Sequence, residues 1–209
     1  MKQKILDRAR QLYNTHGLST VTARVICADL NISLGSFSYH FPDKKIILQS
    51  LYEAMLVEIQ TIYTSIQDES PSIITYLDSH KNLFLIQEKY KFFYLNLFEI
   101  LSQYPEIKKV HLKKRSEEMY MARQVFKHYM DMGILKKDIS AEQMERLINV
   151  GQLLHTFWPI DSEIASEVPQ NHRFMHYMKI CCGLLEPFLE LPSKEAYHNY
   201  FNRLIQKQH

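Results

Sequence analysis

Histidine and cysteine side chains near the C-terminus have types and spacings that could do chemistry. His172 and His176 stand four residues apart, a spacing that places two imidazoles on one face of a helix and can hold a metal ion. No third ligand follows at a suitable distance, so we expect no metal site. Cys181 and Cys182 are candidates for a thiol sensor, although adjacent cysteines in an apolar helix are more often small buried side chains. No Ser/His/Asp set, phosphate-binding loop or carboxylate pair stands out, so we expect neither an enzyme nor a cofactor.

A second group of polar residues, between Thr22 and Lys44, suits nucleic-acid binding. Residues 1–50 carry seven basic and three acidic side chains, a net charge of +4, and the remainder of the chain has a net charge of −2. A basic module on a slightly acidic body is typical of a chain that turns one end toward phosphates. A chance distribution of charge is the alternative reading.

Short amphipathic helices would have to position these polar residues. Apolar side chains recur at helical spacing from Ile5 to Tyr13, and Gly17 is suited to end this first helix because glycine adopts a left-handed backbone at little cost. Thr22 is the expected N-cap of a second helix, in which Val25, Ile26 and Leu30 would point inward.

A tight turn should separate the second helix from a third, very short one. Asn31 tolerates the left-handed conformation that closes a helix, and Ser33 is an N-cap for a helix over 34–40. Phe37 and Phe41 would anchor this third helix in the core. Helix, short turn and helix in this order predict a helix-turn-helix.

The run from Thr22 to Lys44 resembles the DNA-binding signature of the TetR (tetracycline-repressor-like) family of transcription regulators. The matching positions are Thr22, Ile26, Cys27, Ile32, Ser33, Gly35, Ser36, Phe37, His40, Phe41 and Lys44. The likeness covers roughly residues 5–52, a quarter of the chain. Ser38 stands where the family usually has tyrosine, and the tyrosine is displaced to Tyr39, which affects one customary phosphate contact.

The resemblance implies how the module would hold DNA. The base-facing residues would be Leu34, Ser36 and Tyr39, with Ser38 also on the outer side of the third helix. Phosphate contacts would come from Thr22, Arg24, His40 and Lys44, partly because helix N-termini attract anions. The alternative for Tyr39 and His40 is that they pack beside Phe41.

The rest of the chain reads as long helices, because it has few glycines and prolines and its apolar residues recur every three or four positions. We expect an all-α fold of about ten helices, the number that the family implies. The expected helices after the third are 43–67, 72–88, 90–103, 105–132, 140–158 (halted by Pro159), 171–189 and 193–206. We divide the chain into a helix-turn-helix DNA-binding domain, residues 1–47, and an effector-binding and dimerisation domain, residues 48–209.

An aromatic group in the larger domain is a candidate effector pocket. Aromatic walls with a few polar groups are typical of ligand sites. The candidate residues are Phe93, Asn96, Tyr120, Phe126 and Trp158. Ordinary core packing is the more common role for each of them taken singly.

These readings together predict a one-component transcription regulator. We expect a cytoplasmic homodimer that represses from a double-stranded DNA operator and is released by a small, largely apolar effector. Three cysteines fit a reducing compartment, and the chain shows no signal peptide or membrane span. The alternative is a helical interaction protein of the same fold that recognises a protein partner instead of DNA.

Overall fold

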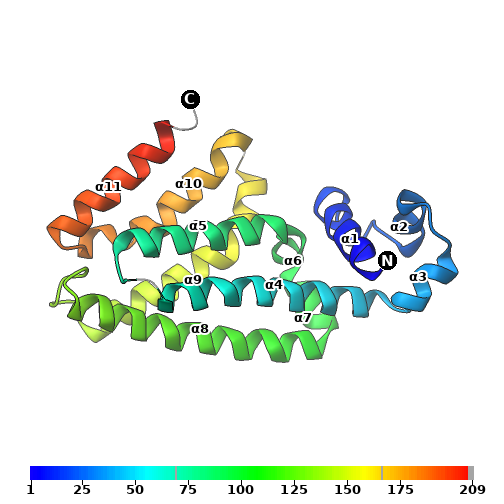
Figure 1. The fold of residues 1–209 in the computed structure, drawn as a ribbon, viewed down its shortest axis with the longest axis horizontal. Coiled ribbons are helices and arrows are strands. Elements are labelled where there is room, and N and C mark those ends of the chain that lie inside the picture. Colours follow the sequence, from blue (N-terminus) through cyan, green and yellow to red (C-terminus); the bar gives the residue numbers. More distant parts are fainter. Residues whose placement is uncertain (69, 166, 207–209) are drawn as a thin grey trace. The chain divides into compact units, whose positions relative to one another are not determined.

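The computed structural model describes residues 1–68, 70–165 and 167–206, and it is all-α (Figure 1). Among these residues, the only pairing of extended backbone is an isolated antiparallel bridge between Leu135 and Leu189. The helices are α1 (Lys2–His16), α2 (Ala23–Leu30), α3 (Leu34–His40), α4 (Lys44–Asp68), α5 (Ile73–Lys89), α6 (Lys91–Leu95), α7 (Leu97–Gln103), α8 (Pro105–Asp131), α9 (Ala141–Ile164), α10 (Gln170–Gly183) and α11 (Leu191–Gln206), with a 3₁₀ turn η1 (Glu186–Phe188).

The described helices form two compact units. The first, called here the N-terminal unit, contains residues 1–60 and 86–111, and the second, called the C-terminal unit, contains residues 61–85 and 112–209. The expected boundary between residues 47 and 48 stays a prediction. The compact units are divided differently, because the first also includes the end of α5, both short helices α6 and α7, and the start of α8.

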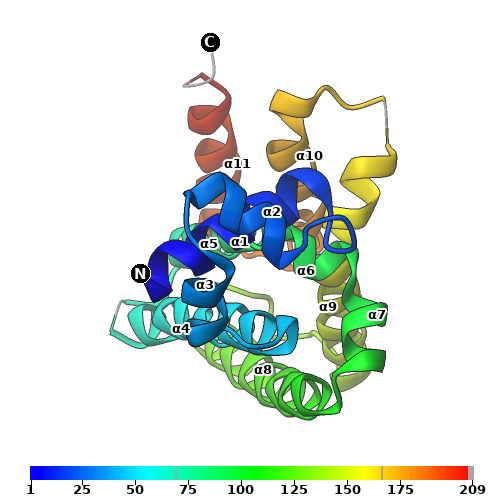
Figure 2. The ribbon, with the colours of Figure 1, turned by 90° about the vertical axis from the view of Figure 1, so that its right-hand side faces the viewer.

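The first three helices lie close together (Figure 2), and their inward side chains form a small apolar core. Ile5, Ala9 and Tyr13 on one face of α1 are buried, as the apolar spacing of the sequence predicts. Ile26 of α2 and Phe37 of α3 are buried as well. Each large apolar side chain buried here contributes roughly 1.5–3 kcal/mol, which holds three helices too short to be stable alone.

The C-terminal unit has a larger core with many aromatic side chains. Phe84 of α5 stacks on Trp158 of α9 with 4.7 Å between ring centroids, and Tyr177 of α10 lies next to the same indole. Leu77 and Met178 are fully buried in this core. A bidentate ion pair between Arg123 of α8 and Glu145 of α9 joins two of its helices near the surface, with N–O distances of 2.5 and 2.9 Å.

Three sequence expectations about helices are wrong. Pro159 does not halt α9, which runs on to Ile164. An interior proline costs about 3 kcal/mol through its missing N–H and the clash of its ring, and the burial of Trp158 and Pro159 offsets this cost. The helix expected over 90–103 is broken at Asn96 into α6 and α7, which makes one helix more than the expected ten. The side-chain amide of Asn96 donates to the carbonyl of Phe92 at this break.

The helix expected over 171–189 ends at Gly183. The Leu185 N–H bonds the Cys182 carbonyl three residues back, and a 3₁₀ turn that contains Pro187 follows.

Candidate nucleic-acid interface

Thr22 begins α2 as the sequence predicts. Its backbone is extended, and its side-chain oxygen accepts a hydrogen bond from the Val25 N–H at 3.4 Å. Thr22 and Arg24 are both exposed at this helix N-terminus, where free N–H groups and the helix dipole favour an anion. Val25 itself is exposed, contrary to expectation, because Ile26 and Cys27 take the inward positions of this short helix.

The turn between α2 and α3 depends on Asn31. Its backbone is left-handed, with φ 52° and ψ 49°, and its N–H bonds the carbonyls of Cys27 and Ala28. Ser33 then caps α3, accepting a hydrogen bond from the Ser36 N–H at 3.1 Å. The left-handed C-cap Asn31 and the N-cap Ser33 thus fix where α2 ends and α3 starts, as expected for a helix-turn-helix.

The two sides of α3 differ sharply in exposure. Phe37 is 3% exposed and its ring contacts that of Phe41, which anchors the helix. Leu34 is 47% exposed and Tyr39 is 85% exposed. Tyr39 therefore does not pack beside Phe41; the ring that it contacts is that of half-buried His40, 5.1 Å away.

The remaining α3 residues proposed for DNA contact lie at the edges of this outer side. Ser38 is exposed and Ser36 is half-buried. Leu34, Ser38 and Tyr39 thus give α3 a solvent-facing surface of one apolar, one hydroxyl and one phenol side chain. Such groups can contact a thymine methyl or a base edge in the major groove.

Lys44 points into the module. Its ammonium donates to the carbonyl of Leu18 at 2.6 Å and lies 5.7 Å from the centre of the Tyr13 ring. Burial lowers the pKa of Lys44, although the nearby carboxylate of Glu99 opposes the shift. Lys44 therefore ties the loop after α1 to the start of α4, and its phosphate contact stays a prediction.

Lys2 is an exposed cation that the sequence analysis included in the net charge of residues 1–50 but did not name as a DNA contact. Its ammonium lies 5.8 Å from the centre of the Phe41 ring, at the end of α3. The excess of basic residues at the start of the chain could have pointed to Lys2 as a phosphate contact. Arg8 instead pairs with Asp29 and joins α1 to α2, and this hydrogen-bonded pair lowers the pKa of the Asp29 carboxyl.

The candidate effector residues do not come together as one group. Phe93 and Asn96 belong to the N-terminal unit, where Phe93 stacks on Tyr52 with centroids 4.8 Å apart. Phe126 and Trp158 are buried in the core of the C-terminal unit, and Tyr120 of the same unit is 61% exposed. Their role in effector binding stays a prediction.

Two histidines in the C-terminal unit were missed by the sequence reading. The half-buried rings of His80 on α5 and His155 on α9 lie 5.1 Å apart, and Phe84 contacts the ring of His155. Burial lowers the pKa of His80 to about 4 and that of His155 to about 3, the second helped by the neighbouring imidazole. No sequence signal joins them, because they lie on different helices far apart in the chain.

The C-terminal cysteines and histidines have unremarkable surroundings. Cys181 and Cys182 are buried, and burial raises the pKa of Cys181 to about 12 and that of Cys182 further, which disfavours the reactive thiolate. His172 and His176 are exposed. Within the described ranges, His, Cys, Asp and Glu side chains form no group of three or more placed to hold a metal ion. Of the helices in those ranges, none has the length and apolar character needed to cross a membrane.

Two sequence models of one family match the chain. The model described as bacterial regulatory proteins of the tetR family matches residues 5–51, and the TetR model described as bacterial transcriptional repressor matches residues 54–197. A comparison with curated proteins found no match.

Solved structures of similar fold carry the same family name or a regulator's description. A TetR-family transcriptional regulator from Marinobacter aquaeolei VT8 has a TM-score of 0.87 and 19% identity, covering 97% of this chain and 98% of its own. The fatty acid degradation regulator FadR from Bacillus halodurans has a TM-score of 0.65 and 13% identity over 88% and 93% of the two chains. A transcriptional regulator from Saccharomonospora viridis, solved in complex with choline, has a TM-score of 0.63 and 16% identity over 84% and 92%.

These three likenesses support the fold. The two family models match the helix-turn-helix residues and most of the remaining chain. The chain therefore belongs to the TetR family of bacterial transcription regulators.

Proposed function

We propose that this chain is a homodimeric repressor that binds an operator through α2 and α3 and leaves it when a small molecule binds the C-terminal unit. The exposed outer side of α3, held by buried Phe37 and Phe41, is the observation that carries the proposal. A helix anchored on one side and exposed on the other suits insertion into a major groove.

In this proposal, Leu34, Ser36, Ser38 and Tyr39 face bases. Thr22, Arg24 and His40 face phosphates, and exposed Lys2 joins them. Lys44 has to release the Leu18 carbonyl before its ammonium can reach a phosphate. α3 carries no arginine or glutamine for bidentate contacts with bases, so DNA shape contributes to specificity.

The homodimer is supported by the surfaces of α9 and α10. α9 exposes Leu153, Phe157 and Ile164, and α10 exposes Ile180. Nothing lies within 4 Å of the position that a Cβ on Gly151 would occupy, which leaves room for close approach of a partner helix. Two recognition helices must also reach successive major grooves about 34–36 Å apart, which a monomer cannot do.

The effector is proposed to bind among the aromatic residues of the C-terminal unit. This region offers apolar side chains such as Phe126 and Trp158, together with the imidazoles of His80 and His155. Neutral imidazoles can donate or accept hydrogen bonds, so a largely apolar molecule with a few polar groups fits best. Native mass spectrometry of the purified protein should show a dimer and the mass of any small molecule that it retains.

DNA selection tests the proposal. Wild-type protein is used to enrich a random duplex library, and the enriched duplex is then assayed by gel shift with the wild type and two variants. Tyr39→Ala should weaken binding about thirtyfold or more, because the dimer loses two base contacts that each contribute roughly 1–3 kcal/mol. Phe98→Ala, which removes an aromatic side chain that is 86% exposed on α7, is the matched control and should bind as the wild type.

Failure to enrich any sequence would reject the operator and favour the interaction-protein alternative. If both variants bound as the wild type, the assignment of Tyr39 would be wrong.

A further inference from the structure

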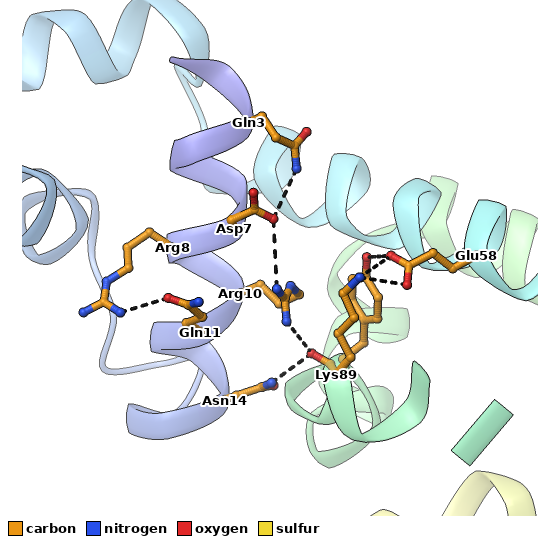
Figure 3. Close-up of polar contacts among 9 residues, drawn as sticks. Gln3, Asp7, Arg8, Arg10, Gln11, Asn14, Glu58 and Lys89 are labelled. Carbon is orange, nitrogen blue, oxygen red and sulfur yellow. Dashed lines mark hydrogen bonds and ion pairs between the residues drawn. The ribbon is translucent and has the colours of Figure 1, made fainter. Parts of the chain in front are cut away.

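The turn between α5 and α6 is held by side chains of α1 (Figure 3). The side-chain N–H of Asn14 donates to the Lys89 carbonyl at 2.9 Å, and its Oδ1 accepts the Phe92 N–H at 2.8 Å. Arg10 donates to the same Lys89 carbonyl at 3.2 Å. One asparagine thus bridges the last residue of α5 and the first turn of α6.

These bonds complete two helix ends. The last carbonyls and the first N–H groups of a helix have no partner within that helix. Lys89 ends α5 and Phe92 is the second residue of α6, so Asn14 satisfies one group at each end. Asn14 is half-buried, which makes an unsatisfied group at this turn more costly than at an open surface.

α4 holds the same turn from another direction. The Lys89 ammonium pairs with Glu58 at 2.7 and 2.8 Å, and the Tyr90 hydroxyl donates to Glu58 at 2.7 Å. Burial is the largest cause that raises the pKa of Tyr90, and the hydrogen bond to Glu58 is the second. Arg10 lies over the Tyr90 ring, 5.6 Å from its centre. Two helices of the N-terminal unit therefore fix the position of the turn.

α5 contributes to both compact units. Its residues 73–85, which include His80 and Phe84, belong to the C-terminal unit, and its residues 86–89 belong to the N-terminal unit. Phe84 and Lys89 are separated by about 7.5 Å of continuous helix at 1.5 Å per residue. The Lys89 carbonyl at the end of this helix accepts hydrogen bonds from Arg10 and Asn14 of α1.

We propose that Asn14 is the positioning residue through which a change along α5 reaches the DNA-binding helices. The inference rests on the proposed function, in which occupancy of the C-terminal unit alters DNA binding. It adds hydrogen bonds from α1 to the covalent crossings between the two units, which lie within α4, α5 and α8. Because coupling between two sites is reciprocal, DNA binding should in turn alter the α5–α6 turn.

Amide hydrogen exchange, measured with and without the enriched duplex described above, tests this connection. In the wild type, the duplex should slow exchange in a peptide covering residues 86–95 about fivefold or more, the usual range of coupling. In Asn14→Ala without DNA, exchange of the Phe92 amide should become on the order of tenfold faster, since its acceptor is lost. In that variant the duplex should no longer slow exchange in the peptide.

Thr15→Ala is the matched control, because the Thr15 hydroxyl donates to the Gln11 carbonyl of its own helix; it should behave as the wild type. If Asn14→Ala does not fold, Asn14→Asp keeps the acceptor for Phe92 and removes the donor to Lys89, and should retain only part of the DNA effect. If no duplex binds the wild type, the proposed function fails and the inference with it. If the duplex binds but leaves residues 86–95 unchanged, or slows them equally in Asn14→Ala, only the inference fails.

Discussion

Lowering the pH from 7 to 5 is expected to destabilise the folded chain, and replacing His80 and His155 by phenylalanine should remove most of that loss. In the folded chain the pKa of His80 is about 4 and that of His155 about 3, below the ordinary value of 6.5. The stability gained from keeping both rings neutral is therefore complete above pH 6.5 and is lost as the pH falls toward 4. At pH 5 nearly every unfolded chain holds both protons, and few folded chains do.

The size of the effect follows from these values. The pH of 5 lies 1.5 units below the unfolded pKa of 6.5, and each unit is equivalent to about 1.36 kcal/mol. Each histidine therefore lowers the free energy of unfolding by about 2 kcal/mol, and the two together lower it by about 4 kcal/mol. Both side chains keep some exposure to water, which screens their charge, so the expected loss is about 2–4 kcal/mol. Tyr76 and Cys182 in the same core stay neutral in this range, because burial raises their pKa values.

Urea unfolding at a fixed protein concentration measures this loss, with far-UV circular dichroism as the signal. The comparison is between the wild type and His80→Phe/His155→Phe at pH 7 and pH 5. His172→Phe serves as the control, since His172 is exposed, and it should lose as much stability as the wild type. The reasoning is refuted if the double variant loses as much as the wild type, or if the wild type loses less than about 1 kcal/mol.

Three further predictions concern single positions. Tyr39→Ala should weaken operator binding about thirtyfold or more in gel shift, because the dimer loses two base contacts. The dimer should stay intact in sedimentation because Tyr39 is 85% exposed, and an unfolded variant would show a structural role. Asn31→Ala should lower the free energy of unfolding by about 1–2 kcal/mol, because alanine is strained at φ 52°. Asn31→Gly should keep the wild-type stability, and equal losses in the two variants would contradict the left-handed turn. Phe157→Asp should dissociate the proposed dimer in sedimentation, whereas Val57→Asp, at an exposed position on α4, should not; a dimeric Phe157→Asp would move the interface elsewhere.

Helix starts could be predicted from the sequence because their signals are local. Thr22, Ser33 and Ser140 each cap the helix that follows them, as their types predict, and Ser140 forms a full capping box with Gln143. The left-handed end at Asn31 is local in the same sense. Such residues act on backbone groups within three or four positions, so neighbouring residues are enough to recognise them.

The features that were predicted wrongly or missed depend on packing. Pro159 breaks an isolated helix, but α9 continues through it because the surrounding residues are buried against other helices. The paired imidazoles of His80 and His155 come together only when α5 packs on α9. The double hydrogen bond of Asn14 likewise joins α1 to a turn far along the chain. Periodicity shows that a helix has an inner face but does not show which helix that face will meet.

Salt dependence of DNA binding tests the central claim most directly. Fluorescence anisotropy titrations of the wild-type protein on the enriched duplex are run from 50 to 200 mM salt, together with Arg24→Gln. With about six phosphate contacts per dimer, affinity should fall about a thousandfold over this range, and Arg24→Gln should flatten the slope of log affinity against log salt by about two, one for each subunit. An affinity that hardly changes with salt, or equal binding to unrelated duplexes, would contradict a repressor that reads DNA through α3.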